Sequence, residues 1–592
     1  MTYLFNTPSE FASDALHGLT SAHPDLLAPV YGGVVRASET PAGQPALVVG
    51  GGSGHYPAFA GWVGSGLAHG AVCGNVFSSP SASQVYSVAR NAENGGGILL
   101  GYGNYAGDVL HFGAAAEKLR HEGFDVRIIE VTDDIMSNPA EQHLERRGIA
   151  GDLAVFKITG AAIEAGATLD DAERVARKAN DATRSFGLAF DGCTLPGADD
   201  ALFHVPAGTM AVGLGIHGEP GVRDQPIGTA AEVAELLVTE ILKEEPHRAD
   251  TSYTGRAAAI LNGLGTVKYE ELFVVYGNVA AELERRGVTV VLPEVGEFVT
   301  SLDMAGLSLT LVFLDDELEA LWRAPAHAPG YLRTAPPIGT PRTSVWTPGR
   351  EQVPDADEQS RELAARAHEV LEHLAAVCDE HEGELGALDA VAGDGDHGSA
   401  MVAGSRGACA AARDVRERGA GARTLLLRAG SAWADAAGGT SGALWGAALT
   451  AVAGQLSDHG GADEQRILDA LCAGVEAMQR LGGASLGDKT ILDAALPFVT
   501  ELRRPGRDAS TALREGARAA RAAAEATAAI VARRGRARVL AEKSIGTPDP
   551  GATSFALLVG ALSDHAYSSS RAGGGRSDLP LTVPPVGLKA AD

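Results

Sequence analysis

A proline-rich run near the middle of the chain separates two stretches with different residue patterns. Prolines recur between residues 325 and 354, including Pro336, Pro337, Pro341 and Pro348. Because proline lacks a backbone N–H and fixes φ, such a run favours an extended linker over a helix or strand. The stretch before it alternates short apolar strands with helices, whereas the stretch after it is almost entirely helical.

This change of pattern predicts the domain limits. We expect an α/β domain of two subdomains at residues 1–328, a linker at 329–357, an all-α domain at 358–568 and a flexible tail at 569–592. A chain of 592 residues is also too long for a single hydrophobic core.

Short apolar runs in the first part lead into glycine-rich loops and helices. Runs at 46–49, 98–100 and 126–131 are expected strands, and residues 109–121 have a helical pattern. This rhythm is typical of α/β sheets, which bind ligands at the carboxyl ends of their strands. It resumes at 255–315, which predicts the second subdomain.

The second part contains eight segments with helical periodicity, rich in Ala, Leu, Arg and Glu, and few strand signals. We expect these helices to form an eight-helix barrel or bundle. The segments are 360–378, 399–417, 422–437, 444–456, 464–481, 490–503, 510–532 and 553–564.

The composition limits the partners and the compartment. A formal charge of −27 argues against nucleic acid or an anionic membrane surface as a partner. The five cysteines are widely spaced and form no C-x-x-C pair, which indicates a reducing compartment. The N-terminal residues lack the basic and apolar segments of a signal peptide, and no apolar run is long enough to span a bilayer. We therefore expect a cytoplasmic protein.

An aspartate-rich stretch at 388–398 is the strongest chemical signal in the helical part. Asp389, Asp394 and Asp396 fall within eight residues, and glycines flank the last two. Glycine permits a sharp turn, and a turn that carries carboxylates suits Mg²⁺, which is commonly shared with substrate phosphates. An ordinary surface turn would be the simpler interpretation of this stretch alone.

Three further loops of small residues begin or end expected helices, at 438–442, 487–490 and 544–551. Backbone N–H groups and hydroxyls at a helix N-terminus can hold phosphate. Each loop alone is a weak signal. Together with the aspartate-rich stretch, they predict a magnesium–nucleotide site at one end of the helical domain.

The α/β part has different candidates. Gly-Gly-Gly-Ser-Gly-His at 50–55 follows a strand, but it lacks the spacing of a dinucleotide fingerprint and fits a small polyol better. Asp108 follows the second strand and is a candidate base. His217 lies among glycines at 213–221, in a loop that is unsuited to core packing. His55, Asp108 and His217 together predict a reactive site.

These motifs resemble those of the ATP-dependent dihydroxyacetone kinases of the single-chain type. In that family a ketose-binding K domain is fused to a nucleotide-binding L domain. The resemblance covers residues from about 8 to about 570, and it rests on the motifs at 50–55, 104–108, 215–221, 393–398 and 544–551.

The resemblance implies roles for residues of the first domain. His217 would bind the ketone carbonyl covalently as a hemiaminal, while His55 and Asp108 assist that step and take the proton from the attacking hydroxyl. A neutral imidazole adds to a carbonyl but not to an alcohol, so such a site would reject glycerol. Substrate contacts are implied for Gly52, Ser53, Gly54 and Gly103.

The resemblance also implies the cofactors, ATP and Mg²⁺, and a homodimer. Asp389, Asp394 and Asp396 would hold Mg²⁺ on the ATP phosphates, where it neutralises charge as the γ-phosphoryl group moves. The residues expected to contact ATP are His397, Gly398, Ser399, Thr440, Ser441, Gly483, Arg536, Asp549, Pro550 and Gly551.

Three positions depart from the usual family pattern. Gly103 stands where a lysine is common, Tyr56 where a glutamate is common, and Thr547 where a histidine is more usual. A missing cation leaves space beside the pocket. These departures resemble the family branch that phosphorylates erythrulose, in particular D-erythrulose at C4, although dihydroxyacetone itself remains an option.

Three other functions stay open at this stage. One is a phosphotransfer-system enzyme that keeps ADP bound and takes phosphate from a carrier protein, although fusion of both domains in one chain argues against it. Another is a non-catalytic ketose sensor, which has no reason to keep three metal-binding carboxylates. A third is the cyclising lyase activity on FAD with Mn²⁺ that occurs in some relatives.

Overall fold

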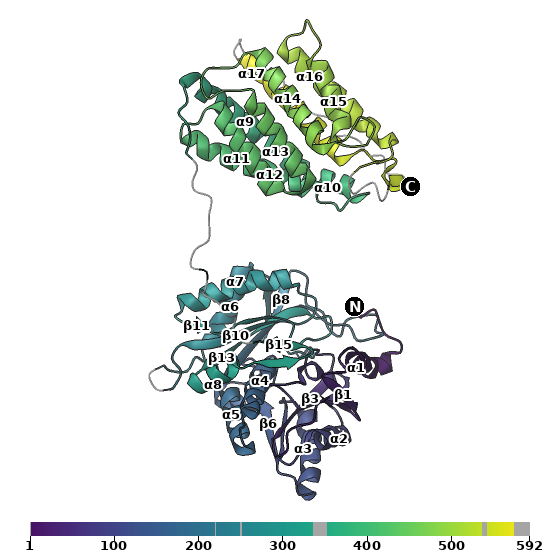
Figure 1. The fold of residues 1–592 in the computed structure, drawn as a ribbon, viewed down its shortest axis with the longest axis vertical. Helices are drawn as coiled ribbons and strands as arrows, with labels where there is room; N and C mark the ends of the chain where they lie inside the picture. The colour runs from purple at the N-terminus through teal and green to yellow at the C-terminus, as the bar shows by residue number, and fades with distance from the viewer. Residues whose placement is uncertain are drawn as a thin grey trace. The chain divides into compact units, whose positions relative to one another are not determined.

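The computed structural model describes residues 2–219, 221–248, 251–334, 342, 352–534 and 541–572. The chain forms two compact units, Met1–Pro341 and Arg342–Asp592 (Figure 1). Each unit is described on its own. No helix within these residues is long and apolar enough to cross a membrane.

The first sheet of the first unit has six strands in the order β1-β2-β4-β3-β5-β6. Strands β3 to β6 pair in parallel, and β1 and β2 extend the sheet in antiparallel fashion. The strands are β1 Leu27–Val30, β2 Gly33–Arg36, β3 Ala46–Ser53, β4 Gly70–Val76, β5 Ile98–Gly103 and β6 Val126–Val131.

Side chains of β3 alternate between the two faces of this sheet, as the period of a strand requires. Ala46 and Val48 pack with residues of α2 (Ala82–Ala92) and α3 (Ala106–His121). Leu47 and Val49 belong to the core on the other face, with α4 and α5. These two helices are α4 Gly151–Glu164 and α5 Leu169–Asp181.

The second sheet has the order β11-β10-β13-β7-β8-β9, with β12 also paired to β10. It is mostly antiparallel, and α6 and α7 cover one face (Figure 1). The elements are β7 Thr183–Asp191, β8 Thr209–Val212, β9 Arg223–Pro226, α6 Ala230–Leu242, β10 Arg256–Gly263, α7 Tyr269–Arg285, β11 Thr289–Val290, β12 Glu294–Gly296, β13 Ala305–Leu314 and α8 Asp316–Arg323.

Helix α4 lies in the core that both sheets share. Its Phe156 packs in one hydrophobic cluster with Leu99 of β5 and with Ile260 of β10. Every residue from Gly151 to Ile163 is buried. A helix that is apolar on all sides is expected in such a position. The polar residues at its first turn are therefore held away from bulk water.

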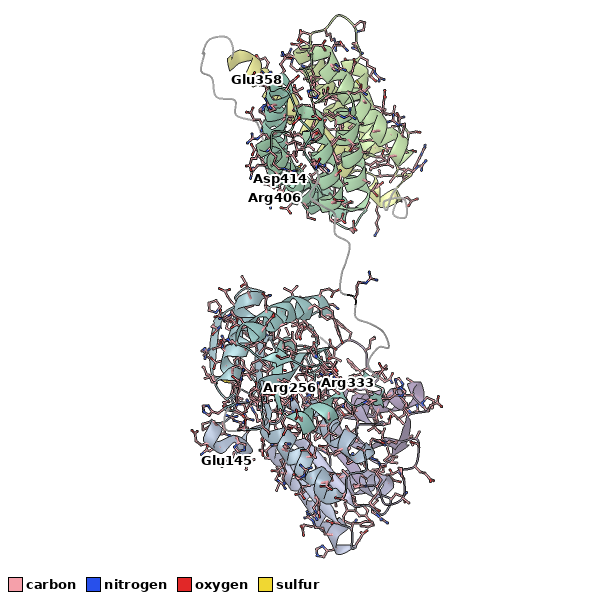
Figure 2. All side chains as sticks on the ribbon, turned by 60° about the vertical axis from the view of Figure 1, so that its left-hand side comes forward. Glu145, Arg256, Arg333, Glu358, Arg406 and Asp414 are labelled. Atoms are coloured by element: carbon pink, nitrogen blue, oxygen red, sulfur yellow. The ribbon has the colours of Figure 1, made fainter. Side chains whose placement is uncertain are left out.

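A short hairpin extends the first unit into the predicted linker. Strands β14 (Ala326–Ala328) and β15 (Tyr331–Arg333) pair in antiparallel fashion. Arg333, labelled in Figure 2, is buried, pairs with Glu294 and donates to Trp322 O at 2.8 Å. The expected linker at 329–357 therefore begins too early, because contacts with distant residues hold this segment in the domain.

The second unit contains nine α-helices within the described residues (Figure 1). Eight correspond to the expected segments, and α10 was not expected. The helices are α9 Glu358–Glu380, α10 Glu382–Ala390, α11 His397–Glu417, α12 Ala422–Ala437, α13 Gly439–Gly454, α14 Glu464–Gly482, α15 Ile491–Leu502, α16 Ala509–Ala526 and α17 Pro550–Ala572.

Two details of this unit differ from the expectation. Helix α16 ends at Ala526, and a 3₁₀ turn follows at Thr527–Ala529, although periodicity suggested a helix to residue 532. Helix α17 continues to Ala572, past the expected start of the tail at 569, and the rest of that tail lies outside the described residues.

Candidate active site

The two candidate histidines of the first unit contact each other. His55 follows β3, and His217 lies in the loop between β8 and β9. Their Nε2 atoms are 3.0 Å apart. The Nδ1 of His55 is 2.6 Å from Thr300 O, and the Nδ1 of His217 is 3.1 Å from Glu219 Oε1. The fold thus forms one chain of contacts, from Thr300 through both rings to Glu219.

The partners at the ends of this chain decide where its protons lie. A carbonyl oxygen and a carboxylate only accept hydrogen bonds, so both Nδ1 atoms carry protons. The two facing Nε2 atoms then share one proton. Burial, followed by the neighbouring charge of His217, lowers the pKa of His55 to about 3, so His55 holds no second proton near neutral pH.

Glu219 stabilises this arrangement. Burial opposes its ionisation, but hydrogen bonds from the ring and the backbone of His217 outweigh that effect and lower the pKa of Glu219 to about 2. The Glu219 carboxylate therefore orients the reactive ring and balances its charge. Glu219 lies in the sequence motif at 215–221, but the residue pattern did not predict its role.

Aromatic rings surround His217. His55, Phe77 and Tyr105 lie with ring centroids 4.8, 5.4 and 4.8 Å from it. Gly54 makes room for this group, because its φ is +101° and a Cβ there would lie 2.8 Å from the Phe77 ring. The side chain of His217 is one-quarter exposed, which leaves its ring open to a small molecule.

Asp108 lies in the first turn of α3 and is buried. Its Oδ2 accepts a hydrogen bond from Ser79 Oγ at 2.8 Å, whereas Oδ1 has no hydrogen-bond partner among the described residues. Burial raises the pKa of Asp108 to about 6, while the Ser79 hydrogen bond and the charge of His217 act in the opposite direction. A carboxylate with a pKa near neutrality and one unused oxygen is suited to take a proton from a hydroxyl.

The four residues expected to contact substrate lie at or just beyond the carboxyl ends of β3 and β5. Gly52 approaches the backbone of Ser78 so closely that a Cβ would lie 2.8 Å from its N atom. Ser53 donates its hydroxyl hydrogen to Gly74 O at 2.6 Å. Gly103 ends β5, and a Cβ there would meet Asp152 Oδ2 at 3.3 Å.

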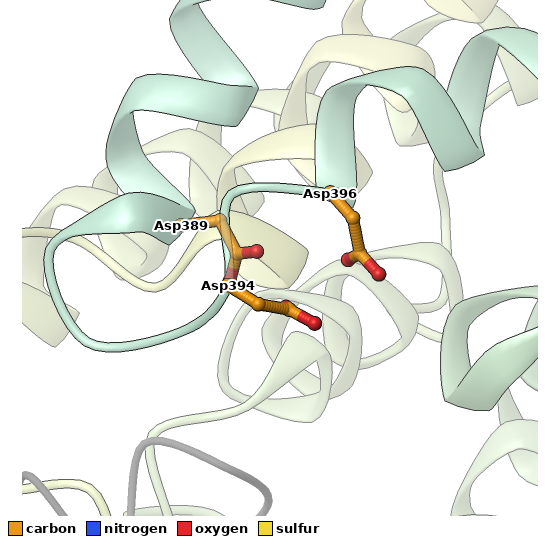
Figure 3. Close-up of side chains that lie close together, drawn as sticks. All are labelled: Asp389, Asp394 and Asp396. Carbon is orange, nitrogen blue, oxygen red and sulfur yellow. The ribbon is translucent and has the colours of Figure 1, made fainter. Parts of the chain in front are cut away.

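The second unit brings Asp389, Asp394 and Asp396 together (Figure 3). Each has a carboxylate oxygen within 4.8 Å of the others. Asp389 lies in the last turn of α10, and its Oδ2 accepts the backbone N–H of Gly395 at 2.9 Å, while Gly395 turns the chain with φ +81°. Three hard oxygen donors on a tight turn fit Mg²⁺.

These carboxylates line a cavity of about 630 Å³. The N-terminus of α13 also lines this cavity; Gly438 is its N-cap, and no side chain accepts from the first N–H groups. Such free N–H groups can bind an anion. His397 links two walls of the cavity, because its Nε2 lies 2.9 Å from Ser554 Oγ and its Nδ1 lies 3.3 Å from Ser441 Oγ.

Asp549 and Lys489 form another part of the cavity lining. Asp549 caps α17 by accepting the N–H of Ala552 at 2.7 Å. Burial raises its pKa to about 7, with smaller contributions from neighbouring carboxylates. Lys489 donates to Ser544 O, and burial lowers its pKa. Lys489 lies in the small-residue loop at 487–490, but the residue pattern did not predict its role.

Most expected nucleotide contacts line this cavity, but some do not. His397, Thr440, Ser441, Asp549, Pro550 and Gly551 are lining residues. Gly398, Ser399 and Gly483 are outside the lining. Gly398 instead allows α11 to approach α10, since a Cβ there would lie 2.0 Å from Glu382 O. Arg536 lies outside the described residues, and Arg534 lines the cavity close by in sequence.

Comparison with known proteins agrees with this organisation. Residues 17–330 match the Dak1 domain, and residues 391–564 match the DAK2 domain. The L-erythrulose 1-kinase of Mycolicibacterium smegmatis is 67% identical, over 95% of this chain and 100% of its own length. The D-erythrulose kinase of the same organism is 51% identical, over 96% of this chain and 100% of its own length.

A solved structure shares the same architecture. The crystal structure of the dihydroxyacetone kinase from C. freundii in complex with AMP-PNP and Mg²⁺ has a TM-score of 0.59 and 31% identity, and covers 95% of this chain and 99% of that chain. The fold and the two sites define an ATP-dependent ketose kinase with both domains in one chain. The chain belongs to the dihydroxyacetone kinase family.

Proposed function

We propose that this kinase phosphorylates erythrulose with ATP, and that it holds the ketose on His217 during the reaction. The observation that carries the proposal is the contact chain that runs from Thr300 through His55 and His217 to Glu219. It leaves one ring nitrogen at a small-molecule site, ready to react once its proton is transferred. Dihydroxyacetone is the alternative acceptor.

Capture of the ketose moves one proton and forms one bond. The Nε2 of His217 passes its proton to the Nε2 of His55, and its lone pair then adds to the carbonyl carbon. The electrons of the C=O π bond move to oxygen, which receives the proton from His55. The product is a hemiaminal whose ring keeps the Nδ1 proton and one positive charge, which the Glu219 carboxylate balances, and no proton is gained or lost overall. Only a carbonyl can undergo this step, so glycerol is excluded.

The transfer step needs a base at the acceptor hydroxyl and a neutralised triphosphate. Asp108 can take the hydroxyl proton on its unused Oδ1. Asp389, Asp394 and Asp396 would hold Mg²⁺ in the second unit, and backbone N–H groups at the start of α13 would bind phosphate oxygens. Bound Mg²⁺ would stabilise the charge that develops on the transferred phosphoryl group.

Within erythrulose, we favour the L enantiomer with phosphorylation at C1 over the D enantiomer with phosphorylation at C4. The L-erythrulose 1-kinase shares 67% identity with this chain, and the D-erythrulose kinase shares 51%. The sequence alone had favoured the D enantiomer.

A coupled assay of ADP release tests the proposal, with L-erythrulose, D-erythrulose, dihydroxyacetone, glyceraldehyde and glycerol as acceptors. We expect turnover with ketoses, highest with L-erythrulose, and none with glycerol. Turnover with ATP and no carrier protein would exclude the phosphotransfer-system alternative. Absence of turnover with every ketose would contradict the proposal and favour the sensor. Conversion of FAD to a cyclic phosphate in the presence of Mn²⁺ would show that the protein also has the lyase activity.

Two variants separate the roles of the two sites. His217→Ala should weaken ketose capture and let glycerol compete, while nucleotide binding is unchanged. Asp394→Asn should lower turnover with every acceptor by at least about a hundredfold and leave ketose binding unchanged, because a lost transition-state interaction of a few kcal/mol has that effect. Full activity of Asp394→Asn would refute the metal assignment.

A further inference from the structure

Asp152 is a buried carboxyl group that the mechanism above does not use. It lies in the first turn of α4 and is 3% exposed. Its Oδ1 is buried without a hydrogen-bond partner in the described part of the chain. An unsatisfied buried polar atom is costly, so it requires an explanation, such as a role in binding a ligand.

The surroundings of Asp152 connect it to the ketose site. The charge of Asp108 acts on Asp152, and the charge of Asp152 acts on Tyr105, whose ring lies against His217. Tyr105 Oη and Asp108 Oδ1 are also buried without a hydrogen-bond partner among the residues described. Three polar atoms without partners therefore lie on the side of the site where β5 ends.

Two glycines make room for the Asp152 carboxyl group. A Cβ on Gly103 would lie 3.3 Å from Oδ2, and a Cβ on Gly148 would lie 3.0 Å from Oδ1. Any side chain at position 103 would therefore crowd or cover this group. Because Gly103 has no side chain, the Asp152 carboxyl group packs directly against the end of β5.

We propose that Asp152 recognises the additional hydroxyl group that distinguishes a four-carbon ketose from dihydroxyacetone. Erythrulose extends the three-carbon ketose by one carbon that bears a hydroxyl, and this hydroxyl would reach the Asp152 carboxyl group at the end of β5. Burial, followed by the charges of Asp133 and Asp108, raises the pKa of Asp152 well above its usual value, which favours the protonated form, and that form can both donate and accept. A hydroxyl has the same two capacities. This inference rests on the proposed function and names the residue that sets acceptor size.

Asp152→Ala and the near-isosteric Asp152→Asn test the assignment. We expect Asp152→Ala to lower kcat/KM for L-erythrulose by about tenfold or more, with less than about threefold change for dihydroxyacetone, because only the longer ketose loses a hydrogen bond to a buried group. Asp152→Asn keeps a donor and an acceptor, so its kcat/KM for L-erythrulose should lie between that of Asp152→Ala and that of the wild type. Gly103→Ala should shift the preference between the two ketoses in the same direction, because the new methyl group would crowd the Asp152 carboxyl group.

Ketose binding measured by calorimetry without nucleotide gives a second readout. The Kd of L-erythrulose should rise about tenfold in Asp152→Ala, while the Kd values of dihydroxyacetone and of Mg·ATP stay the same. An equal loss for both ketoses, or no loss for erythrulose, would overturn the assignment. Wild-type protein that binds ketoses without phosphorylating them would contradict the proposed function. The ratio of the Kd values for L-erythrulose and dihydroxyacetone, compared between the wild type and Asp152→Ala, would still test the role of Asp152.

Discussion

At the scale of single residues, function depends on which atoms carry protons. Thr300 and Glu219 fix the protons on the outer nitrogens of His55 and His217 and leave one proton between the inner ones. Asp108, in contrast, must have lost its proton, because only the ionised carboxylate can accept a proton from the substrate hydroxyl. Its pKa of about 6 therefore predicts a turnover that falls as the pH drops through about 6.

Ser79→Ala tests this assignment of the base. The Ser79 hydroxyl stabilises the ionised form of Asp108 through a 2.8 Å hydrogen bond. Its removal should raise the Asp108 pKa and move the acidic limb of the kcat profile upward by roughly half a unit to one unit. Ser78→Ala is the matched control, since that exposed hydroxyl donates to Val76 O. A limb that stays in place or moves to lower pH would argue against Asp108.

At the scale of elements, the strongly periodic helices and the buried strands β3, β5 and β6 could be predicted from sequence. Helix α10 could not, because it has only nine residues, two of them glycine, and it depends on packing against α11. Strands β14 and β15 have three residues each and are held by distant partners of Arg333. The local residue pattern did not point to Asp152 either, because it does not show that helix α4 is buried between two sheets.

Gly398→Ala tests the contact that positions the aspartate turn. The new methyl group would collide with the carbonyl oxygen of Glu382, and backbone cannot move aside easily. We expect a loss of roughly 1–3 kcal/mol in the free energy of unfolding of the second unit, measured with urea. Gly383→Ala is the control, since a Cβ there meets no atom within 4 Å and should stabilise α10 by roughly 0.5 kcal/mol. Equal stability of both variants would contradict this packing argument.

At the scale of the whole molecule, two compact units divide the chemistry. Residues proposed to bind ketose lie in the first unit, and those proposed to bind nucleotide lie in the second. A kinase needs both the ketose site and the nucleotide site. The sequence of either unit alone would therefore predict only the binding of its own ligand. The homodimer implied by the family resemblance stays a prediction, which light scattering of the full chain would test.

Calorimetry of the full chain should show two unfolding transitions. Mg·ATP should raise the midpoint temperature of one transition and L-erythrulose that of the other, because each ligand stabilises only the unit that binds it. At a hundred times its Kd, a ligand adds about 2.7 kcal/mol to the stability of that unit. If a single ligand raised both transitions equally, the assignment of one ligand to each unit would be wrong.

We propose that His217 holds the ketose through a bond to its carbonyl carbon. Carbon-13 NMR of L-erythrulose labelled at C2, bound to the full chain without nucleotide, measures this directly. We expect the carbonyl signal of the bound sugar to be replaced by that of a tetrahedral carbon, and we expect this tetrahedral signal to be absent from His217→Ala. A bound sugar that keeps its carbonyl signal in the wild-type protein would contradict the account.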